Sequence, residues 1–417
     1  MIINFNSILY AISYALDCVE RELLGVATNH SKRVALIATE MGKQCNLTTD
    51  ELIDLAACAI LHDNALAQYI KTEINRERLE NSSKEELAIH CEMGEKNITG
   101  FPFHTDVRGA ILYHHENADG SGCFGLLQEE TPLFAQLIHF ADILDIDCNL
   151  GEKENNKYQN VKEYLQERSG TVFAEEHVNL FLTIFSPHRF LLLQDTSIDQ
   201  MVKESIPVRF DEFDEADLIH IAGIFAEIID YKSEFTKKHS IGIAEKAKIM
   251  SEYYGFDEET IGKMYLAGAL HDIGKVIINS NVLEKPDKLT AKEYIYIKNH
   301  AKYSYDILSK IEGLEDVTSW ACMHHEKLDG SGYPFGKKAS ELGQKERLMA
   351  CLDIYQALTE ERPYKSGMSH EISMEILYDM AEQGLIDGEI CRDIDLRFGK
   401  THQLTKYDDL KVESHNL

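Results

Sequence analysis

The sequence predicts an all-α protein built from two tandem helical bundles. Three observations carry this prediction. The chain has 417 residues, enough for two ordinary domains, and only seven are proline, so long helical runs are permitted. Its apolar fraction of 44% supports buried cores. Segments of the first half also return in the second half in the same order, which indicates a duplicated domain.

The repeat is visible in four pairs of segments: TNHSKRVALIATEMG (28–42) with TKKHSIGIAEKAKIM (236–250), LHDNAL (61–66) with LHDIGK (270–275), HHENADGSGCFG (114–125) with HHEKLDGSGYPFG (324–336), and HFADILD (139–145) with ACLDIYQ (350–356). His30 and His62 are 32 residues apart, as are His239 and His271. His90 and His114 are 24 residues apart, as are His300 and His324. We therefore expect a first domain over 1–205, a join over 206–216 and a second domain over 217–417.

The second copy places seven side chains of metal-ligand type on or after predicted helices. They are His239 near the start of one helix, His271 and Asp272 at the end of the next, His300 on a helix opened by a capping box of Thr290 and Glu293, His324 and His325 after the helix with Trp320, and Asp353 on a helix over 345–359. A lone histidine on an apolar helix face is usually a core residue. Donors that converge from five helices instead indicate a metal site, because helical bundles build metal sites in this way. Imidazole with carboxylate suits Fe, Mn, Zn or Ni.

The first copy keeps all seven positions, so a second metal site is predicted there. Its residues are His30, His62, Asp63, His90, His114, His115 and Asp142. An inherited fold that holds no metal is the alternative interpretation of the same residues.

Three motifs of the second copy carry a family resemblance: HDIGK (271–275), HHEKLDGSGYP (324–334) and ERPYK (361–365). In this order they resemble the HD-GYP domain, a member of the HD superfamily of metal-dependent phosphohydrolases, over about residues 220–400. The resemblance implies a helical bacterial signalling enzyme that hydrolyses cyclic dinucleotides. It implies cyclic di-GMP as substrate and linear pGpG as product, with further cleavage to GMP left open. The first copy is then a degenerate HD-type domain.

The resemblance also implies roles for individual residues. Asp272 would bridge two metal ions beside the attacking hydroxide, and Lys275 would hold a phosphate oxygen; these two are the expected catalytic residues. Arg362 and Lys365 would contact phosphate or guanine, and Tyr333 would line the base pocket. The expected cofactors are two divalent transition-metal ions, Fe or Mn, in the second domain.

Two departures from the family pattern bear on substrate and metal number. Gln356 stands where family members often carry Asp, so a mixed guanine–adenine cyclic dinucleotide is the alternative substrate. Phe235 stands where members with three metals carry a carboxylate, so two metals are expected. Glu326 and Asp329 follow the last histidines, and for each a role in orienting the ligands and a plain surface turn are equally open.

The first copy has lost the groups that the resemblance assigns to substrate. Leu66 replaces the phosphate-binding lysine, Cys123 and Phe124 replace Tyr-Pro, and nothing after Asp142 resembles ERPYK. A regulatory or structural role is therefore predicted for it.

Charge and cysteine usage exclude several partners. The net charge of −29 excludes polymeric nucleic acid and anionic membranes as partners. Nine cysteines without a CxxC pair indicate reduced thiols and a cytoplasmic protein. Expected partners are the cyclic dinucleotide, diguanylate cyclase (GGDEF) proteins and a second copy of the chain. A non-catalytic signalling scaffold that binds the dinucleotide remains the alternative to an enzyme.

Overall fold

The computed structural model describes residues 1–24, 28–66, 84–230, 236–283, 285, 287–361 and 367–399. The fold is all-α, as predicted, with two three-residue strands as the only sheet within these ranges. The chain divides into two compact units, one over Ile2–Glu212 and one from Phe213 onward. None of the described helices is both long enough and apolar enough to cross a membrane.

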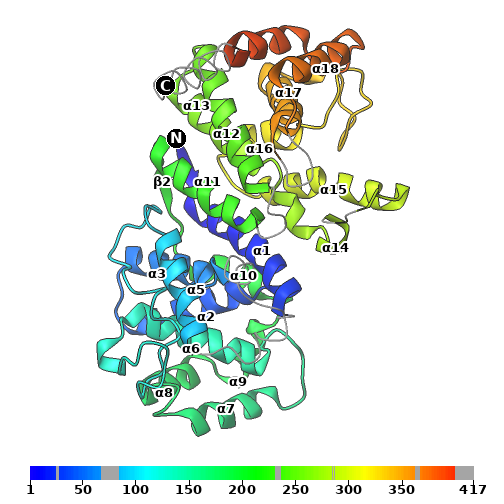
Figure 1. Cartoon of the computed structure of the whole chain (residues 1–417). Helices are drawn as coiled ribbons and strands as arrows, with labels where there is room; N and C mark the ends of the chain where they lie inside the picture. The colour runs from blue at the N-terminus through cyan, green and yellow to red at the C-terminus, as the bar shows by residue number, and fades with distance from the viewer. Residues whose placement is uncertain are drawn as a thin grey trace, which may run out of the picture. The chain divides into compact units, whose positions relative to one another are not determined.

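The first unit contains the helices that carry the first set of histidines, followed by the helices that complete its bundle (Figure 1). Its α-helices are α1 (Phe5–Leu24), α2 (His30–Gln44), α3 (Thr49–Leu61), α5 (Lys84–Asn97), α6 (Leu133–Cys148), α7 (Lys157–Arg168), α8 (Glu175–Ile184), α9 (Pro187–Phe190) and α10 (Ile198–Ser205). Short 3₁₀ turns lie at η2 (Gln128–Glu130) and η3 (Leu191–Leu193).

The second unit repeats the order of the ligand-bearing helices. Its elements are α11 (Glu215–Asp230), α12 (Thr236–Tyr253), α13 (Glu258–Leu270), η4 (Ile273–Ile277), α14 (Ser280–Leu283), α15 (Ala291–Leu308), α16 (Glu315–Cys322), η5 (Ala339–Glu341), α17 (Gln344–Thr359) and α18 (His370–Glu382). The predicted capping box at the start of α15 is confirmed: the Thr290 hydroxyl accepts from Glu293 N, and the Glu293 carboxylate accepts from Thr290 N.

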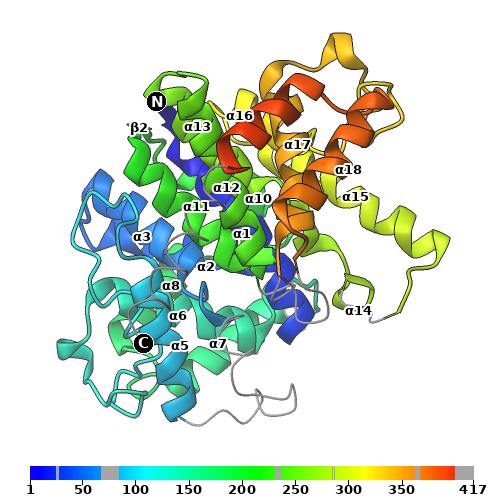
Figure 2. The same ribbon diagram turned by 45° about the horizontal axis from the view of Figure 1, so that its top comes forward.

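Equivalent helices pack together in the two units. In the first unit α2 packs against α3 and α6; in the second unit α12 packs against α13 and α17, which Figure 2 shows from a second direction. These contacts bury apolar faces that include Ala244, Ala247 and Leu266. Each unit therefore brings the helix with its first histidine beside the helix that ends at its His-Asp pair.

The first unit extends beyond the predicted end at residue 205. Strand β1 (Ile2–Asn4) pairs antiparallel with β2 (Phe210–Glu212), which lies in the segment expected to be a linker. Arg209, just before β2, is buried and donates to Asp54 of α3 at 3.0 Å. Ladder hydrogen bonds and a buried ion pair therefore fix residues 209–212 in the first unit. A three-residue strand has too little periodic pattern to be predicted from sequence.

Candidate metal centre

The structure brings the seven predicted donors of the second unit together between its helices. They come from α12, the turn after α13, α15, the turn after α16, and α17, and six of the seven are buried. Two groups of donor atoms, each with its atoms within 4.8 Å of one another, share no residue: His239, His271 and Asp353 in one, and His300, His324 and His325 in the other. A third such group, His271, Asp272 and His324, links them.

Asp272 lies between these two groups. Its Oδ2 is 3.1 Å from Nε2 of His271, and its Oδ1 is 3.3 Å from Nε2 of His300. One carboxylate therefore offers one oxygen to each donor group. This is the arrangement by which a single side chain can bridge two metal ions.

Backbone carbonyls fix the orientation of three of the imidazoles. Nδ1 of His271, His300 and His324 lies 2.6–2.7 Å from the carbonyl oxygen of the residue three positions earlier. Each of these carbonyls belongs to a residue of a helix. When Nδ1–H donates to that carbonyl, Nε2 carries the lone pair and faces the centre. The helix geometry thus turns the Nε2 atoms of these three imidazoles towards the centre.

His239 is oriented by a carboxylate instead. Its Nδ1 lies 3.1 Å from Oε2 of Glu360, and its Nε2 lies 3.2 Å from Oδ1 of Asp353. Glu360 was missed by sequence reasoning. The signal was present, because Glu360 lies seven residues after Asp353 and therefore on the same face, at the end of α17.

The ionisation states of the clustered side chains suit the binding of cations. Burial opposes ionisation of Asp272, but His271 and Lys275 beside it hold its pKa well below the ordinary value. Burial lowers the pKa of His300 to about 3, so this imidazole is neutral. Nε2 of His271 and Oδ1 of Asp272 are buried and make no hydrogen bond within the described part of the chain. Ionised Asp272, the neutral imidazole of His300 and unsatisfied buried donor atoms fit divalent metal ions.

Three of the five predicted substrate residues lie in the described ranges. Lys275 Nζ is 2.5 Å from Oδ2 of Asp272, at the edge of the donor cluster. The Tyr333 ring lies 4.7 Å from the His325 ring, and Nζ of Lys298, which sequence reasoning missed, lies 4.7 Å from the Tyr333 ring. Gln356 is buried, and its Oε1 accepts from Lys246 Nζ at 2.7 Å. Arg362 and Lys365 fall outside the described residues, as does Phe235.

Glu326 holds the loop that carries Tyr333. Its carboxylate is buried and accepts backbone N–H bonds from Phe335, Gly336 and Lys337 at 2.7–3.1 Å. It is therefore neither a ligand-orienting group nor a solvated turn residue. Asp329 is exposed, and its carboxylate accepts from Ser331 N at 2.9 Å. This geometry is that of a residue in a surface turn.

Gly274 lies in η4, the turn directly after the His-Asp pair. A Cβ at this position would lie 2.0 Å from His300 O and 2.5 Å from Ser304 N. The glycine is required because α15 packs directly against the turn after the His-Asp pair.

The first unit repeats the cluster with its own seven residues. His30, His62 and Asp63 form one donor group, and Asp142 Oδ1 lies 3.3 Å from His30 Nε2 and 3.5 Å from His62 Nε2. Asp63 again offers one oxygen to each side, with Oδ2 3.6 Å from His62 Nε2 and Oδ1 3.5 Å from His90 Nε2. Nδ1 of His62 and of His114 again faces the carbonyl three residues earlier.

The second donor group of the first unit contains a residue that sequence reasoning missed. It consists of His90, Cys91, His114 and His115. The signal for Cys91 in the sequence is weak, because it directly follows a predicted ligand but matches no cysteine motif. Leu66 is buried at the position of Lys275, so no cation from that position reaches the first cluster.

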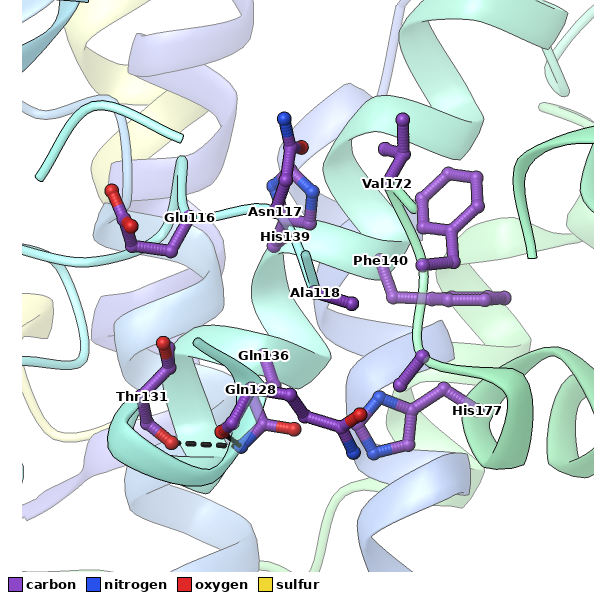
Figure 3. Close-up of a pocket in the computed structure, with 12 residues that line it drawn as sticks. Glu116, Asn117, Ala118, Gln128, Thr131, Gln136, His139, Phe140, Val172 and His177 are labelled. Carbon is purple, nitrogen blue, oxygen red and sulfur yellow. Dashed lines mark hydrogen bonds between the residues drawn. The ribbon is translucent and has the colours of Figure 1, made fainter. Parts of the chain in front are cut away.

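A small cavity of about 20 Å³ lies in the first unit (Figure 3). Gln136 Nε2 donates to Thr131 O and Gln128 O at one side, and His139 and Phe140 of α6 line it as well. Its lining includes Glu116 and, within the described part of the chain, no lysine or arginine. Its volume and charge do not suit a dinucleotide with two phosphates.

Comparisons with known proteins agree with this architecture. The HD domain family matches residues 22–173 and 223–390. A 3'3'-cGAMP-specific phosphodiesterase of Vibrio cholerae is 29% identical over 399 residues, 93% of this chain and 90% of the relative. A cyclic di-GMP phosphodiesterase response regulator of Xanthomonas campestris is 33% identical over 174 residues, 41% of this chain and 46% of the relative.

A solved structure shows the same fold. The crystal structure of a cyclic GMP-AMP specific phosphodiesterase of Vibrio cholerae matches with a TM-score of 0.66 and 23% identity, over 96% of this chain and 98% of that one. Because the family match covers both helical units and most of the chain, the protein belongs to the HD domain family.

Proposed function

We propose that this protein is a metal-dependent phosphodiesterase of cyclic dinucleotides, with 3'3'-cGAMP as its preferred substrate and cyclic di-GMP as the second. The observation that carries the proposal is the position of Asp272, whose two oxygens face two separate groups of donor atoms. The substrate class rests on the relatives, which are named as phosphodiesterases of these two dinucleotides.

The residues of the second unit suit the hydrolysis of a phosphodiester. Metal ions held by the seven donors would supply an activated water and positive charge beside the phosphate. Asp272 would keep the two donor groups at a fixed separation. Lys275 reaches the edge of the cluster, where its ammonium can pair with a phosphate oxygen and stabilise charge in the transition state.

The surroundings of Tyr333 suit a nucleobase. Its ring lies beside the His325 ring, and Lys298 lies over it, so an aromatic face and a cation adjoin the metal donors. Gln356 carries both donors and an acceptor, so it can pair with guanine and with adenine, whereas an aspartate there would accept only. This difference favours the mixed dinucleotide over cyclic di-GMP, which reverses the order that the family resemblance implies.

The test is a direct assay of the full chain. Protein reconstituted separately with Fe(II) and Mn(II) is incubated with 3'3'-cGAMP and with cyclic di-GMP, and the products are separated by chromatography. We expect a linear dinucleotide from both, formed faster from 3'3'-cGAMP, and no product with Asp272→Ala. Binding without turnover in both metal forms would contradict the enzymatic proposal, and faster cleavage of cyclic di-GMP would contradict the preference.

A further inference from the structure

Cys91 is buried among the imidazoles of the first unit. It follows His90 on α5 and has no exposed surface. Its Sγ lies 3.8 Å from His90 Nε2 and 3.7 Å from His114 Nδ1. With His115 these residues give four donor atoms that all lie within 4.8 Å of one another. A sulfur and three imidazoles therefore surround one point.

The second unit has no thiol at the same point. The residue after His300 is Ala301, which is also buried, and the donor group there consists of three histidines. The first unit thus differs from the proposed catalytic unit by one additional protein donor. The other donors of the two groups correspond one to one.

This difference changes the chemistry that the site can support. Catalytic zinc sites keep an open position beside three protein ligands, whereas structural sites close the tetrahedron with four. A thiolate among imidazoles also favours zinc over the harder metals that suit carboxylates. His114 Nε2 is buried and makes no hydrogen bond within the described ranges, while its Nδ1 faces Ile111 O at 2.6 Å. Because Nδ1, the His114 atom that Cys91 Sγ contacts, already faces Ile111 O, Nε2 is the His114 nitrogen available to a metal ion.

We propose that His90, Cys91, His114 and His115 form a closed, zinc-type metal site with a thiolate ligand. The site stabilises the first unit and holds no exchangeable water. It differs in ligand set and in role from the metal pair of the second unit. The proposal does not rest on the proposed phosphodiesterase activity, and it is tested without measuring turnover.

The test uses the full chain freed of metal and reloaded with Co(II) or Zn(II). In the wild type we expect a thiolate-to-Co(II) charge-transfer band in the near ultraviolet. Cys91→Ala should abolish the band and lower bound zinc by about one equivalent per chain. Cys58→Ala is the matched control, because Cys58 is equally buried in the same unit but lies outside the donor group. It should keep both the band and the zinc.

Two results would overturn the proposal: no charge-transfer band in the wild type, or a band and zinc content unchanged in Cys91→Ala. Either result would mean that Cys91 packs as a neutral thiol. If Cys91→Ala does not fold, Cys91→Ser retains the size of the side chain and should still lose the band. Cadmium-113 NMR of the wild type then gives an independent reading, because one sulfur ligand shifts the resonance away from that of an all-nitrogen and oxygen site.

Discussion

The ammonium of Lys275 is the clearest difference between the two units at the scale of single residues. It lies 2.5 Å from the Asp272 carboxylate, whereas the first unit has buried Leu66 at this position. We expect Lys275→Leu to lower kcat/KM for 3'3'-cGAMP by roughly 10²–10³, since one positioned cation at a phosphoryl centre is removed.

The control for this prediction is Lys302→Leu. Lys302 is a lysine of the same unit whose exposed side chain pairs with Asp306 along α15 at 2.8 Å. Such a surface pair contributes about 0.3–0.5 kcal/mol, so activity should stay near that of the wild type. Equal activity of the two variants would remove Lys275 from the mechanism.

Base preference is the property that we assign to Gln356. It is buried, and its acceptor oxygen is already used by Lys246. Gln356→Asp replaces the amide donors with a second acceptor, which favours the donor edge of guanine over adenine. The ratio of kcat/KM for 3'3'-cGAMP to that for cyclic di-GMP should therefore fall by about tenfold, equivalent to 1.4 kcal/mol. An unchanged ratio would place base selection elsewhere.

The sequence predicts which donor-type side chains come together, but it does not predict most of the groups around them. The donors recur at fixed spacings in both halves of the chain, so the repeat alone identifies them. Lys298 and Cys91 reach their partners Tyr333 and His114 only through tertiary packing. Lys246 lies seven residues after His239, so helical periodicity places the two on one face of α12. Glu360 is intermediate, because helical periodicity alone places it on the face of Asp353.

At the scale of elements, the backbone of the loop from Glu326 to Lys337 passes so close to itself that position 332 has no room for a side chain. A Cβ on Gly332 would lie 2.4–2.6 Å from Lys327 N, Glu326 Cα and His325 O, where backbone cannot give way easily. Gly332→Ala should therefore displace Tyr333, raise KM more than it lowers kcat, and cost about 1–3 kcal/mol of unfolding free energy. Steady-state kinetics and denaturant unfolding measure the two effects.

The matched control for the loop is its neighbour. Ser331→Ala changes an exposed residue of the same turn. It should leave KM near the wild-type value and the free energy of unfolding within about 0.5 kcal/mol of the wild type. If Gly332→Ala behaves like Ser331→Ala, the loop does not depend on the close approach of its backbone.

Element boundaries were predictable where local chemistry marks them. The capping box before α15 is a short sequence signal with a fixed geometry, and the structure contains it. The β1–β2 pair joins residues more than 200 positions apart, so nothing near either strand indicates the pairing. The packing of α15 against the turn after His271 also depends on residues far apart in the sequence. Ser304 Oγ donates to His271 O and accepts from Gly274 N.

At the scale of the whole molecule, two units of one architecture hold donor clusters of the same layout but different surroundings. The second cluster adjoins Lys275 and Tyr333, whereas the first has Leu66 and a fourth protein donor, Cys91. The family match covers both units and does not distinguish them. The side chains beside the donors do distinguish them.

Turnover should therefore depend on the second unit alone. Full-length Asp272→Ala should show no hydrolysis of either dinucleotide, although its first unit is intact. Full-length His62→Ala should keep hydrolysis, lose the metal ion bound by His30, His62 and Asp63, and unfold at a lower temperature. A metal ion that binds only the folded state stabilises it, and each kcal/mol lost lowers the midpoint by about 2–4 °C in a domain of this size. Metal analysis, a thermal melt and the chromatographic assay on both variants measure these outcomes. Residual hydrolysis in Asp272→Ala would mean that the first unit is catalytic without Lys275 and Tyr333, and that these residues are not what a substrate site in this fold requires.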